Sequence, residues 1–433
     1  GFICEHPCEA RCRRNMIDDP INIRGLKRYA VDHAGVVPNP PCAPATGKRV
    51  AIVGGGPGGL SAAYYLQLMG HQSVVYEKRK RLGGMLRYGI PNYRFPKKRL
   101  DEDIRAILSA GAIDVKLNCK IGKDITMEKI SGEFDAVYVA IGAQTGKKLR
   151  IDGSDAEGVF SAVDVLSRIG EGQIPDYSGK KVVVIGGGNV AMDCARTAIR
   201  ANAETVSIVY RRRQEDMTAL PAEVEGAVAE GIELVTLKAP LRVEADAEGN
   251  ACALWVQPQI IGPVRGGRPS PRKANKPEER MECDIVLVAI GQDIVSQPFA
   301  DFGLATNWGR IVANEGGAAN MVGVYAGGDC VSGPSTVIKA IAAGKAAAAN
   351  IDEYLGCHHP ISCDVAIPEP MLNDKVPCGR VNLQEVEAWA RRTNFEAIEL
   401  PMSCEEAEQE ASRCLRCDHY GCATLRGGRE FEW

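Results

Sequence analysis

The sequence lacks features that would point to several classes of protein. Its 433 residues carry a formal net charge of -3 and charged residues make up 25%, so the charge balance does not suggest binding to nucleic acid or to a membrane surface. The longest stretch without a charged residue, Val50 to Tyr76, contains six glycines and is a poor membrane span. The chain is long enough for two or three domains, each with its own core.

Cysteine, by contrast, is abundant. The chain has 16 cysteines and is far too large for a disulfide-stapled miniprotein. Because the cysteines crowd toward the two ends, we interpret them as metal ligands in a reducing compartment and expect a cytoplasmic protein. The sequence does not begin with methionine and starts just before a cysteine motif. We therefore expect that residues upstream of Gly1 are missing or were fused to something else.

The stretch from Lys48 to Glu77 organises the chain. It opens with a short apolar run, Val50 to Val53, which predicts a buried strand. A predicted helix, Leu60 to Met69, and a second apolar run, Ser73 to Tyr76, follow. The order of these elements predicts one βαβ unit.

The turn of this unit carries Gly54, Gly56 and Gly59 in G-x-G-x-x-G spacing. Glycines allow a tight turn and let a pyrophosphate approach backbone N–H groups at a helix N-terminus. Glu77, 23 residues after Gly54, is placed to accept hydrogen bonds from ribose hydroxyls. An ordinary glycine turn is the alternative, but the complete strand–helix–strand–acid context favours a dinucleotide site.

The segment from Leu82 to Leu100 completes the first unit. Gly84 permits a close backbone approach, and Arg94 offers a guanidinium fork for a pyrophosphate, although a solvated surface charge is also possible. A helix is predicted from Lys98 to Ala110. An apolar strand over Asp135 to Ala143 then closes the unit.

The motif is repeated in residues 180–213. Gly186, Gly188 and Ala191 give G-x-G-x-x-A after an apolar strand, which predicts a second dinucleotide site. The next strand ends in three arginines, 211–213, where the first unit has an acid. Guanidinium groups bind a 2′-phosphate that an acid would repel, so this site is predicted to prefer NADP(H) over NAD(H). Arginines that face solvent or an acidic partner are the alternative.

Residues 241–350 contain a predicted hairpin, a second closing strand and a last strand–helix segment. Leu241 to Met281 is polar and rich in Gly and Pro, and is predicted to be a hairpin with an exposed, solvated basic loop. Cys283 to Gln292 repeats the apolar closing strand. Residues 323–350 predict a strand, a glycine pair with Asp329, and a helix. Asp329 could hold a polyol hydroxyl or simply cap a turn, and the helix N-terminus near Thr336 could stabilise negative charge.

Each end of the chain carries three closely spaced cysteines. The head has C-x3-C-x3-C and the tail C-x2-C-x4-C, so we expect the tail to fold back onto the head. Such thiolates can hold an iron–sulfur cluster, although zinc and scattered buried thiols are alternatives. Helices are predicted for Ile23 to His33, Gln384 to Arg392 and Glu405 to Arg413, whereas Cys42 in the linker is expected to be structural.

The chain resembles the NADPH-dependent glutamate synthase small-subunit family, nearly continuously over residues 1–350. The resemblance rests on five motifs in order: GGGPGGLSAAYYL, LGGMLRYGIP, GGGNVAMDCARTA, VYRRR and YAGGDCVSGPSTVIKAIAAGK. That family includes the amino-terminal part of dihydropyrimidine dehydrogenase and subunits of flavin-based transhydrogenases. The resemblance implies an α/β fold with two nested Rossmann-type dinucleotide-binding domains. It also implies FAD in the first site, NADPH in the second, and helical segments at both chain ends that bind [4Fe–4S] clusters.

The motifs and the resemblance together define the expected site residues. For FAD they are Gly54, Gly56, Pro57, Gly59, Glu77, Lys78, Gly84, Met85, Arg94, Gly142, Gly328, Asp329, Thr336 and Val337. For NADPH they are Gly186, Gly188, Asn189, Val190, Ala191, Arg211, Arg212, Ala289 and Gly291. For metal they are Cys4, Cys8, Cys12, Cys414, Cys417 and Cys422.

The expected organisation has five segments. They are an iron–sulfur helical segment (1–47), a first FAD-binding segment (48–152), an NAD(P)H-binding domain (153–292), a second FAD-binding segment (293–356) and a carboxyl-terminal extension with a cysteine motif (357–433).

The sequence departs from the family pattern in three places. The cysteine motif that normally lies at the amino terminus stands at the carboxyl end, so the resemblance implies that Cys12 would join the three tail cysteines around one cluster. The usual fourth cysteine of that motif would fall at Arg426, and with Cys12 used in the first cluster the resemblance leaves the second with Cys4 and Cys8 and further ligands that the sequence does not identify. A basic residue that can follow the arginine pair is replaced by Thr218.

The resulting expectation is a flavoprotein subunit that passes electrons between NADPH and iron–sulfur clusters within a larger redox complex, with other redox subunits or ferredoxin as partners. No side-chain nucleophile is needed and none is evident. One alternative is a flavin-linked disulfide reductase, but Leu82 to Leu100 and Gly186 to Ala198 contain no cysteine pair. The other is a structural subunit with vestigial sites, which the intact glycines argue against.

Overall fold

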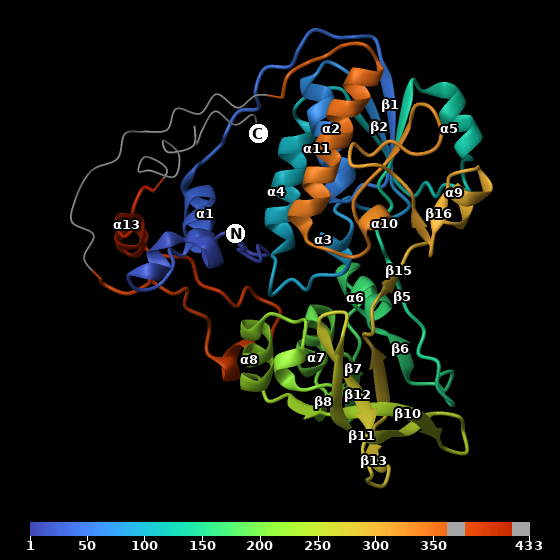
Figure 1. Cartoon of the computed structure of the whole chain (residues 1–433), viewed down its shortest axis with the longest axis vertical. Coiled ribbons are helices and arrows are strands. Elements are labelled where there is room, and N and C mark those ends of the chain that lie inside the picture. Colours follow the sequence, from blue (N-terminus) through green and yellow to red (C-terminus); the bar gives the residue numbers. More distant parts are fainter. Residues whose placement is uncertain (362–376, 418–433) are drawn as a thin grey trace. The chain divides into compact units, whose positions relative to one another are not determined.

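A computed structural model describes residues 1–361 and 377–417 of the chain (Figure 1). Two compact units are present. The described residues of the terminal unit are 1–38, 360–361, 377–386 and 398–417, and the core unit consists of Asn39–His359 and Glu387–Ala397. The two ends of the chain therefore share one unit, so the tail folds back onto the head as expected.

The first sheet of the core unit is parallel, with strand order β18-β4-β1-β2-β3. Its strands are β1 (Arg49–Val53), β2 (Gln72–Tyr76), β3 (Ile113–Lys116), β4 (Ala136–Val139) and β18 (Val324–Ala326). Because β18 lies about 180 residues beyond β4 in the sequence, the chain completes this sheet only after building a second domain. The two domains are therefore nested, and β1 lies where the strand order reverses, the usual position of a ligand site.

Two long helices cover one face of this sheet and pack along each other, α2 (Pro57–Leu68) and α11 (Val337–Tyr354) (Figure 1). Small residues allow the close packing, since a Cβ atom on Gly344 would lie 2.2 Å from the carbonyl oxygen of Gly58. Shorter helices surround the sheet. They are α3 (Met85–Tyr88), α4 (Lys97–Leu108), α5 (Met127–Glu133), α9 (Gln297–Asp301) and α10 (Asp329–Ser332).

The second sheet repeats the architecture, with parallel strand order β6-β14-β7-β8-β9. Its strands are β6 (Val159–Ser161), β7 (Lys181–Ile185), β8 (Thr205–Tyr210), β9 (Glu233–Thr236) and β14 (Ile285–Val288). The helices beside it are α6 (Ala162–Gly170), α7 (Asn189–Arg200) and α8 (Pro221–Ala229), with a 3-10 turn, η3 (Gln214–Asp216).

An antiparallel sheet lies against the other face of the second sheet. It contains β10 (Lys238–Ala245), β11 (Ala251–Arg265), β12 (Arg268–Lys273) and β13 (Glu279–Glu282). Four short strands form two further pairs, β5 (Thr145–Gly146) with β15 (Gln292–Asp293) and β16 (Thr306–Asn307) with β17 (Arg310–Ile311). The hairpin predicted within Leu241 to Met281 is confirmed by the antiparallel pairing of β11 with β12, and its turn at Gly266 and Gly267 is exposed, but most of the stretch forms strands rather than a loop.

The apolar runs of the sequence form the cores. Strands of the second sheet are buried on both faces, so Val182 and Val184 pack toward α7 while Val183 and Ile185 pack toward the antiparallel sheet. A third cluster lies beneath the first sheet. Continuous apolar strands of this kind are typical of parallel sheets that are covered on both sides.

The terminal unit is small and polar. It contains η1 (Glu9–Arg11), η2 (Arg13–Met16), α1 (Ile23–His33) and α13 (Cys404–Ser412). The carboxylate of Glu410 accepts from the backbone N–H of Asn22 at 2.6 Å, and Asp18 binds both Arg14 and Arg413. The hydrogen bond from Arg14, together with one from Arg413, holds the pKa of the Asp18 carboxyl well below its usual range, against the opposing effect of burial.

The predicted helices were confirmed for α1, α2, α4 and α13, within a few residues at their ends. The helix predicted over Gln384 to Arg392 was wrong, because only α12 (Ala388–Arg391) is helical. Glu385 instead forms an antiparallel bridge with Glu399, and the N–H of Val386 donates to the carbonyl of Ile398.

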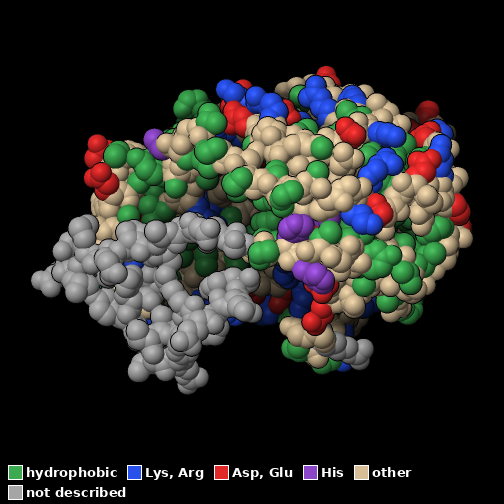
Figure 2. Space-filling view, turned by 90° about the horizontal axis from the view of Figure 1, so that it is seen from above, with side chains coloured by type: hydrophobic (Ala, Val, Ile, Leu, Met, Phe, Trp, Pro, Cys, Tyr) green, Lys and Arg blue, Asp and Glu red, His purple; other side chains and the backbone are tan. Residues whose placement is uncertain are grey.

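Two properties of the structure bear on whether the chain binds nucleic acid or spans a membrane. Basic and acidic side chains are interspersed over the face shown in Figure 2, in keeping with the small net charge. No helix within residues 1–361 and 377–417 is long and apolar enough to cross a membrane.

The division of the chain into the five segments expected from the sequence stays a prediction.

Candidate functional site: two nucleotide-binding units

The first glycine turn joins β1 to α2. Gly54 has a φ of 113°, and a Cβ atom there would lie 2.4 Å from the carbonyl oxygen of Ala140. A Cβ atom on Gly59 would lie 1.9 Å from the carbonyl oxygen of Gly54, so only glycine fits where the helix turns back over the strand. Gly56, in contrast, faces open space apart from Gly84. This turn leaves a cradle of bare backbone at the N-terminus of α2.

Glu77 follows the end of β2 and closes the cradle. Its carboxylate accepts from the N–H of Gly55 at 2.8 Å and from the N–H of Arg79 at 2.8 Å, and the residue is 3% exposed. These two hydrogen bonds fix the carboxylate against the glycine turn. The remaining acceptor positions of its oxygens are available to vicinal hydroxyl groups.

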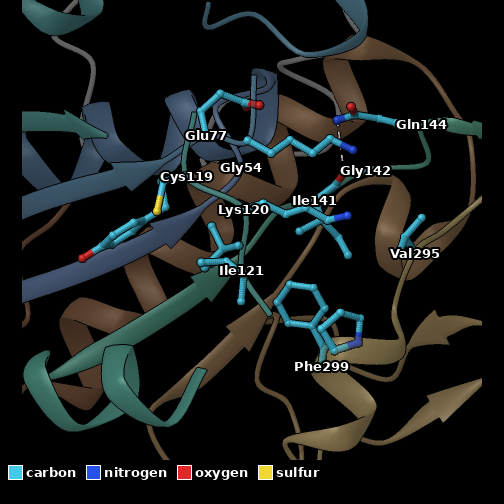
Figure 3. Close-up of a pocket in the computed structure, with 14 residues that line it drawn as sticks. Gly54, Glu77, Cys119, Lys120, Ile121, Ile141, Gly142, Gln144, Val295 and Phe299 are labelled. Carbon is cyan, nitrogen blue, oxygen red and sulfur yellow. Dashed lines mark hydrogen bonds between the residues drawn. The ribbon is translucent and has the colours of Figure 1, made fainter. Parts of the chain in front are cut away.

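A pocket extends from this carboxylate along the ends of the strands (Figure 3). Glu77 and Gly54 lie at one end, and Ile121 and Phe299 form an apolar wall at the other. Gly142 also lines the pocket, beside Gln144. A polar end for a ribose and an apolar end for a flat ring suit the adenosine half of a dinucleotide.

A second group of residues surrounds the helix N-termini at the same sheet edge. Thr336 stands at the N-cap position of α11 but makes no side-chain capping hydrogen bond, and its hydroxyl oxygen is buried without a partner among the described residues. Such an orphaned polar atom is typical of a site that a ligand completes. Asp329 starts α10, and burial raises the pKa of its carboxyl to about 6, partly opposed by the N–H of Ser335. The donors and acceptors present thus fit a flavin dinucleotide.

The remaining residues expected for this site stand on the same elements. They are Pro57 at the start of α2, Lys78 after Glu77, Met85 at the start of α3, Gly328 before α10 and Val337 at the start of α11. Lys78 also lines the pocket.

Arg94 does not have the partner that the sequence suggested. Its guanidinium donates to both carboxylate oxygens of Asp193, at 2.9 and 3.0 Å, and its Nε pairs with Glu223 at 2.9 Å. Two carboxylates already pair with this largely buried fork, and the expected contact with a pyrophosphate stays a prediction. Asp193 lies on α7 and Glu223 on α8, and Arg94 therefore ties a loop of the first domain to the second.

A second arginine network joins the same two domains. Glu230 is fully buried and accepts from Arg196, Arg200 and Arg391 at 2.6–3.2 Å. Arg391 belongs to α12, which comes from the tail of the sequence. The N–H of the Asn92 side chain donates to the carbonyl of Phe395 at 3.0 Å. The short segment 387–397 therefore contacts both nucleotide-binding domains and holds them together.

The second glycine turn joins β7 to α7. Ala191 takes the third motif position, is fully buried, and starts the packing of α7 on the sheet. The side chain of Asn189 accepts from the N–H of Leu220 at 3.0 Å, which anchors the following loop. The other expected residues, Gly186, Gly188, Val190, Ala289 and Gly291, lie on this turn or after the end of β14.

The arginines after β8 are not equivalent. Arg213 pairs with Glu215 and Asp216, and its hydrogen bond to Asp216 raises its pKa. Arg212 donates through Nε to the carbonyl of Pro269 at 2.7 Å, while Arg211 is exposed. Among the residues that the structure describes, Arg211 and Arg212 form no ion pair. Two unneutralised guanidinium groups thus stand where the first unit has Glu77.

With both units in view, comparison with known proteins decides the class. Residues 48–344 match the pyridine nucleotide-disulphide oxidoreductase family. The chain belongs to this family. It is an oxidoreductase of the flavin- and pyridine-nucleotide-dependent type, and its homologues include the glutamate synthase small chain.

Three relatives show how far the similarity of this family member extends. The chain is 36% identical to the NADP(+)-dependent formate dehydrogenase subunit beta of Moorella thermoacetica, over 99% of this chain and 66% of that protein. It is 36% identical to the NADPH-Fe(3+) oxidoreductase subunit beta of Geobacter sulfurreducens, over 98% and 70%. It is 32% identical to the glutamate synthase [NADPH] small chain of Escherichia coli, over 82% and 80%. The chain thus spans about two thirds of the first two relatives.

Solved structures share the fold at low identity. FprA of Mycobacterium tuberculosis, in complex with NADPH, aligns with a TM-score of 0.63 at 20% identity, over 72% of this chain and 85% of that one. Thioredoxin reductase of Lactococcus lactis aligns with a TM-score of 0.54 at 19% identity, over 71% and 99%. These likenesses confirm the doubly wound α/β fold.

The family name includes disulphide chemistry, yet Cys194 and Cys330 do not fit it. Cys194 and Cys330 are buried free thiols, at 1% and 0% exposure, and burial raises both pKa values, that of Cys330 to about 11. Their sulfur atoms point to backbone carbonyls of Ala162 and Gly327. A reactive pair needs accessible, thiolate-prone sulfur atoms.

Five of the cysteines expected to bind metal belong to the terminal unit, but within the described residues no three of their sulfur atoms lie within 4.8 Å of one another. They are Cys4, Cys8, Cys12, Cys414 and Cys417, of which the first four are free thiols. Burial alone would raise the pKa of Cys4, but the N–H of His6 and the ammonium group of Lys27, 3.3 Å away, lower it. Cys422 lies outside the described residues. The donor set that is present consists of thiols, which suits an iron–sulfur cluster.

Proposed function

We propose that FAD occupies the site at Glu77 and NADP(H) the site at Arg211 and Arg212, and that the chain passes electrons between NADPH and iron–sulfur clusters. The observation that supports this assignment is the opposite charge after two otherwise equivalent strands, β2 and β8. A buried carboxylate suits ribose hydroxyls, and unneutralised arginines suit a 2′-phosphate. Two sites of opposite character call for two different nucleotides.

Bound FAD would accept a hydride from NADPH and release electrons singly. The protein residues bind and orient. Glu77 positions the adenosine ribose, the backbone of Gly54–Gly59 receives the pyrophosphate, and Asp329 and Thr336 hold the flavin half. Arg94 and the Glu230 network keep the two domains, and so the two rings, in register. No side-chain nucleophile takes part.

We place the exit for electrons in the terminal unit. Cys12, Cys414, Cys417 and Cys422 would ligate one [4Fe–4S] cluster, with Cys4 and Cys8 contributing to a second possible cluster. A cubane cluster needs four ligands, and neither end of the chain has four cysteines in its motif, which supports ligation from both ends. The names of the formate dehydrogenase and Fe(3+) oxidoreductase relatives describe subunits. We therefore propose other redox subunits, or ferredoxin, as partners.

Anaerobic titration of the purified, yellow protein with NADPH tests the hydride step, because the flavin absorbance should bleach stoichiometrically. Replacing Cys414 and Cys417 by Ser should remove iron and the low-temperature EPR signal of the reduced protein without preventing that bleaching. Cys404→Ser is the matched control, since Cys404 is an exposed thiol of the same unit outside the motifs. Full iron in the double variant would show that the tail cysteines are not ligands.

A disulfide reductase is the second candidate, because the family name includes this chemistry. The burial of Cys194 and Cys330 argues against it. In that case Cys194→Ser or Cys330→Ser should abolish turnover with a disulfide substrate. We expect both variants to keep NADPH-dependent flavin reduction and onward electron transfer.

A further inference from the structure

The antiparallel strands β11 and β12 reach the loop that follows β8 (Figure 1). The contact is made by two residues of β12. The carbonyl of Pro269 accepts from Nε of Arg212 at 2.7 Å, and Nη2 of Arg268 donates to the hydroxyl of Tyr210 at 2.7 Å and to the carbonyl of Asp216 at 2.5 Å. The basic stretch that was expected to be a solvated loop thus lies against the nucleotide-binding unit.

Tyr210 connects this contact to the glycine turn. It is the last residue of β8, and its hydroxyl donates to the carbonyl of Asp216 at 2.8 Å. Its ring lies against Gly187, where a Cβ atom would come within 2.5 Å of the ring. Arg268 therefore lies beside the loop 211–216, at the carboxyl end of β8. In a Rossmann unit the 2′-phosphate of a bound dinucleotide lies just beyond this strand end.

Three arginines around the loop 211–216 have no carboxylate partner among the described residues and are therefore available to bind an anion. Arg213 is neutralised by Glu215 and Asp216. Arg211, Arg212 and Arg268 have no ion pair within residues 1–361 and 377–417. The hydrogen bonds of Arg268 use Nη2 alone, so its Nη1 and Nε keep N–H groups that no described residue accepts. An arginine fork that is fixed on one side and open on the other is preorganised to bind phosphate.

We propose that Arg268, from β12, is a specificity-determining residue that binds the 2′-phosphate of NADP(H) together with Arg211 and Arg212. This inference rests on the proposed assignment of NADP(H) to the second unit and deepens it. Because Tyr210 and the Asp216 carbonyl hold its Nη2, Arg268 loses little side-chain entropy when the phosphate arrives. Its contribution should therefore be comparable to that of the two arginines that the motif identifies.

Binding of 2′,5′-ADP and of 5′-AMP to the full-length flavoprotein tests the proposal, since the two probes differ in the 2′-phosphate. Arg268→Gln should weaken binding of 2′,5′-ADP about ten- to a hundredfold and leave 5′-AMP unchanged, as expected for one charge-assisted contact. The same variant should raise KM for NADPH without changing kcat or the kinetics with NADH. Arg268→Lys should recover part of the loss.

Arg272→Gln is the matched control, because Arg272 is an exposed arginine four residues along the same strand. It removes the same charge and should have little effect. Equal loss of both probes in Arg268→Gln would mean that the arginine supports the loop, and no change would mean that it does not reach the phosphate. Either result overturns the inference. If Arg211→Gln also fails to separate the two probes, the assignment of NADP(H) to this unit fails as well.

Discussion

The two nucleotide-binding units are built alike up to the end of the second strand. Each has a parallel strand pair, a glycine turn and a helix, β1-α2-β2 in one and β7-α7-β8 in the other. They differ in the charge of the residue just after that strand. Glu77 is buried and hydrogen-bonded to the glycine turn, whereas Arg211 is exposed and without a countercharge in the described structure.

The difference shows which element of the motif sets the chemistry. The glycine turn and helix N-terminus provide a generic site for a pyrophosphate, and the two turns share that property. In the proposed complexes the residue that follows the second strand faces the ribose, and its charge decides which nucleotide is accepted. Under this proposal one duplicated scaffold holds two different nucleotides, and the buried arginine networks of Arg94 and Glu230 join the two domains that would bind them.

The largest expected effect concerns the third position of the two glycine motifs, which is Gly59 in the first unit and Ala191 in the second. Gly59→Ala should abolish flavin binding, because the new Cβ would overlap the carbonyl oxygen of Gly54 at 1.9 Å. The second unit already has Ala191 at the matching position, so Ala191→Gly should retain NADPH binding and lose only about 1 kcal/mol of stability, the cost of glycine in a helix. Flavin content after gel filtration and thermal unfolding measure the two outcomes. A fully flavinated Gly59→Ala protein would contradict the proposed packing.

A smaller effect is expected at the acid. Glu77→Gln removes the charge that accepts from the N–H groups of Gly55 and Arg79, and from the ribose in the proposed complex. We expect FAD affinity to fall about ten- to a hundredfold, and NADPH affinity to stay unchanged. Equilibrium dialysis of the apoprotein against FAD measures the change. Equal weakening of both nucleotides would remove the distinction between the units.

The smallest effect concerns pH. Burial raises the pKa of Asp329 to about 6, so this carboxyl is protonated in the flavin-free protein below that pH. Since the ionised form is the better acceptor for flavin hydroxyls, FAD binding should weaken progressively as pH falls below about 6. The stability of the apoprotein should depend on pH in the opposite direction to FAD binding. The ionised carboxyl is the disfavoured form, so its contribution to stability decreases as pH rises from about 3.8, the unfolded value, to about 6.

The variant Asp329→Asn tests both consequences. Its FAD affinity should be lower than that of the wild type at neutral pH and nearly independent of pH between 5 and 7, while binding of NADPH serves as the internal control. A wild-type protein whose FAD affinity is flat across this range would show that Asp329 does not contact the flavin.

Local patterns predicted much of this architecture. The two βαβ units, the closing strands and helix α1 follow from apolar periodicity and glycine spacing within about 30 residues. The nesting of the two domains was expected from the family resemblance, and β18 confirms it by joining the first sheet beside β4.

Contacts between distant residues could not be predicted in this way. Arg94 resembled a pyrophosphate ligand because its nearest motif is the FAD unit, yet its carboxylate partners are Asp193, 99 residues away, and Glu223. Arg268 lies in a polar, Gly- and Pro-rich stretch that has the composition of a loop, and its proximity to Tyr210 results from the pairing of β11 with β12. In both cases the tertiary structure decides which groups the charged side chain contacts.

The central claim is that the charge after the second strand assigns FAD to one unit and NADP(H) to the other. The most direct measurement is the rate of anaerobic flavin reduction by NADPH and by NADH in the double variant Arg211→Gln/Arg212→Gln. Each lost charge-assisted contact should cost about 1.5–3 kcal/mol, or about ten- to a hundredfold in affinity, for NADPH alone. We predict that NADPH reduction becomes far weaker at limiting concentrations while NADH reduction and flavin content stay unchanged. Equal loss with both nucleotides, or loss of the flavin itself, would contradict the assignment.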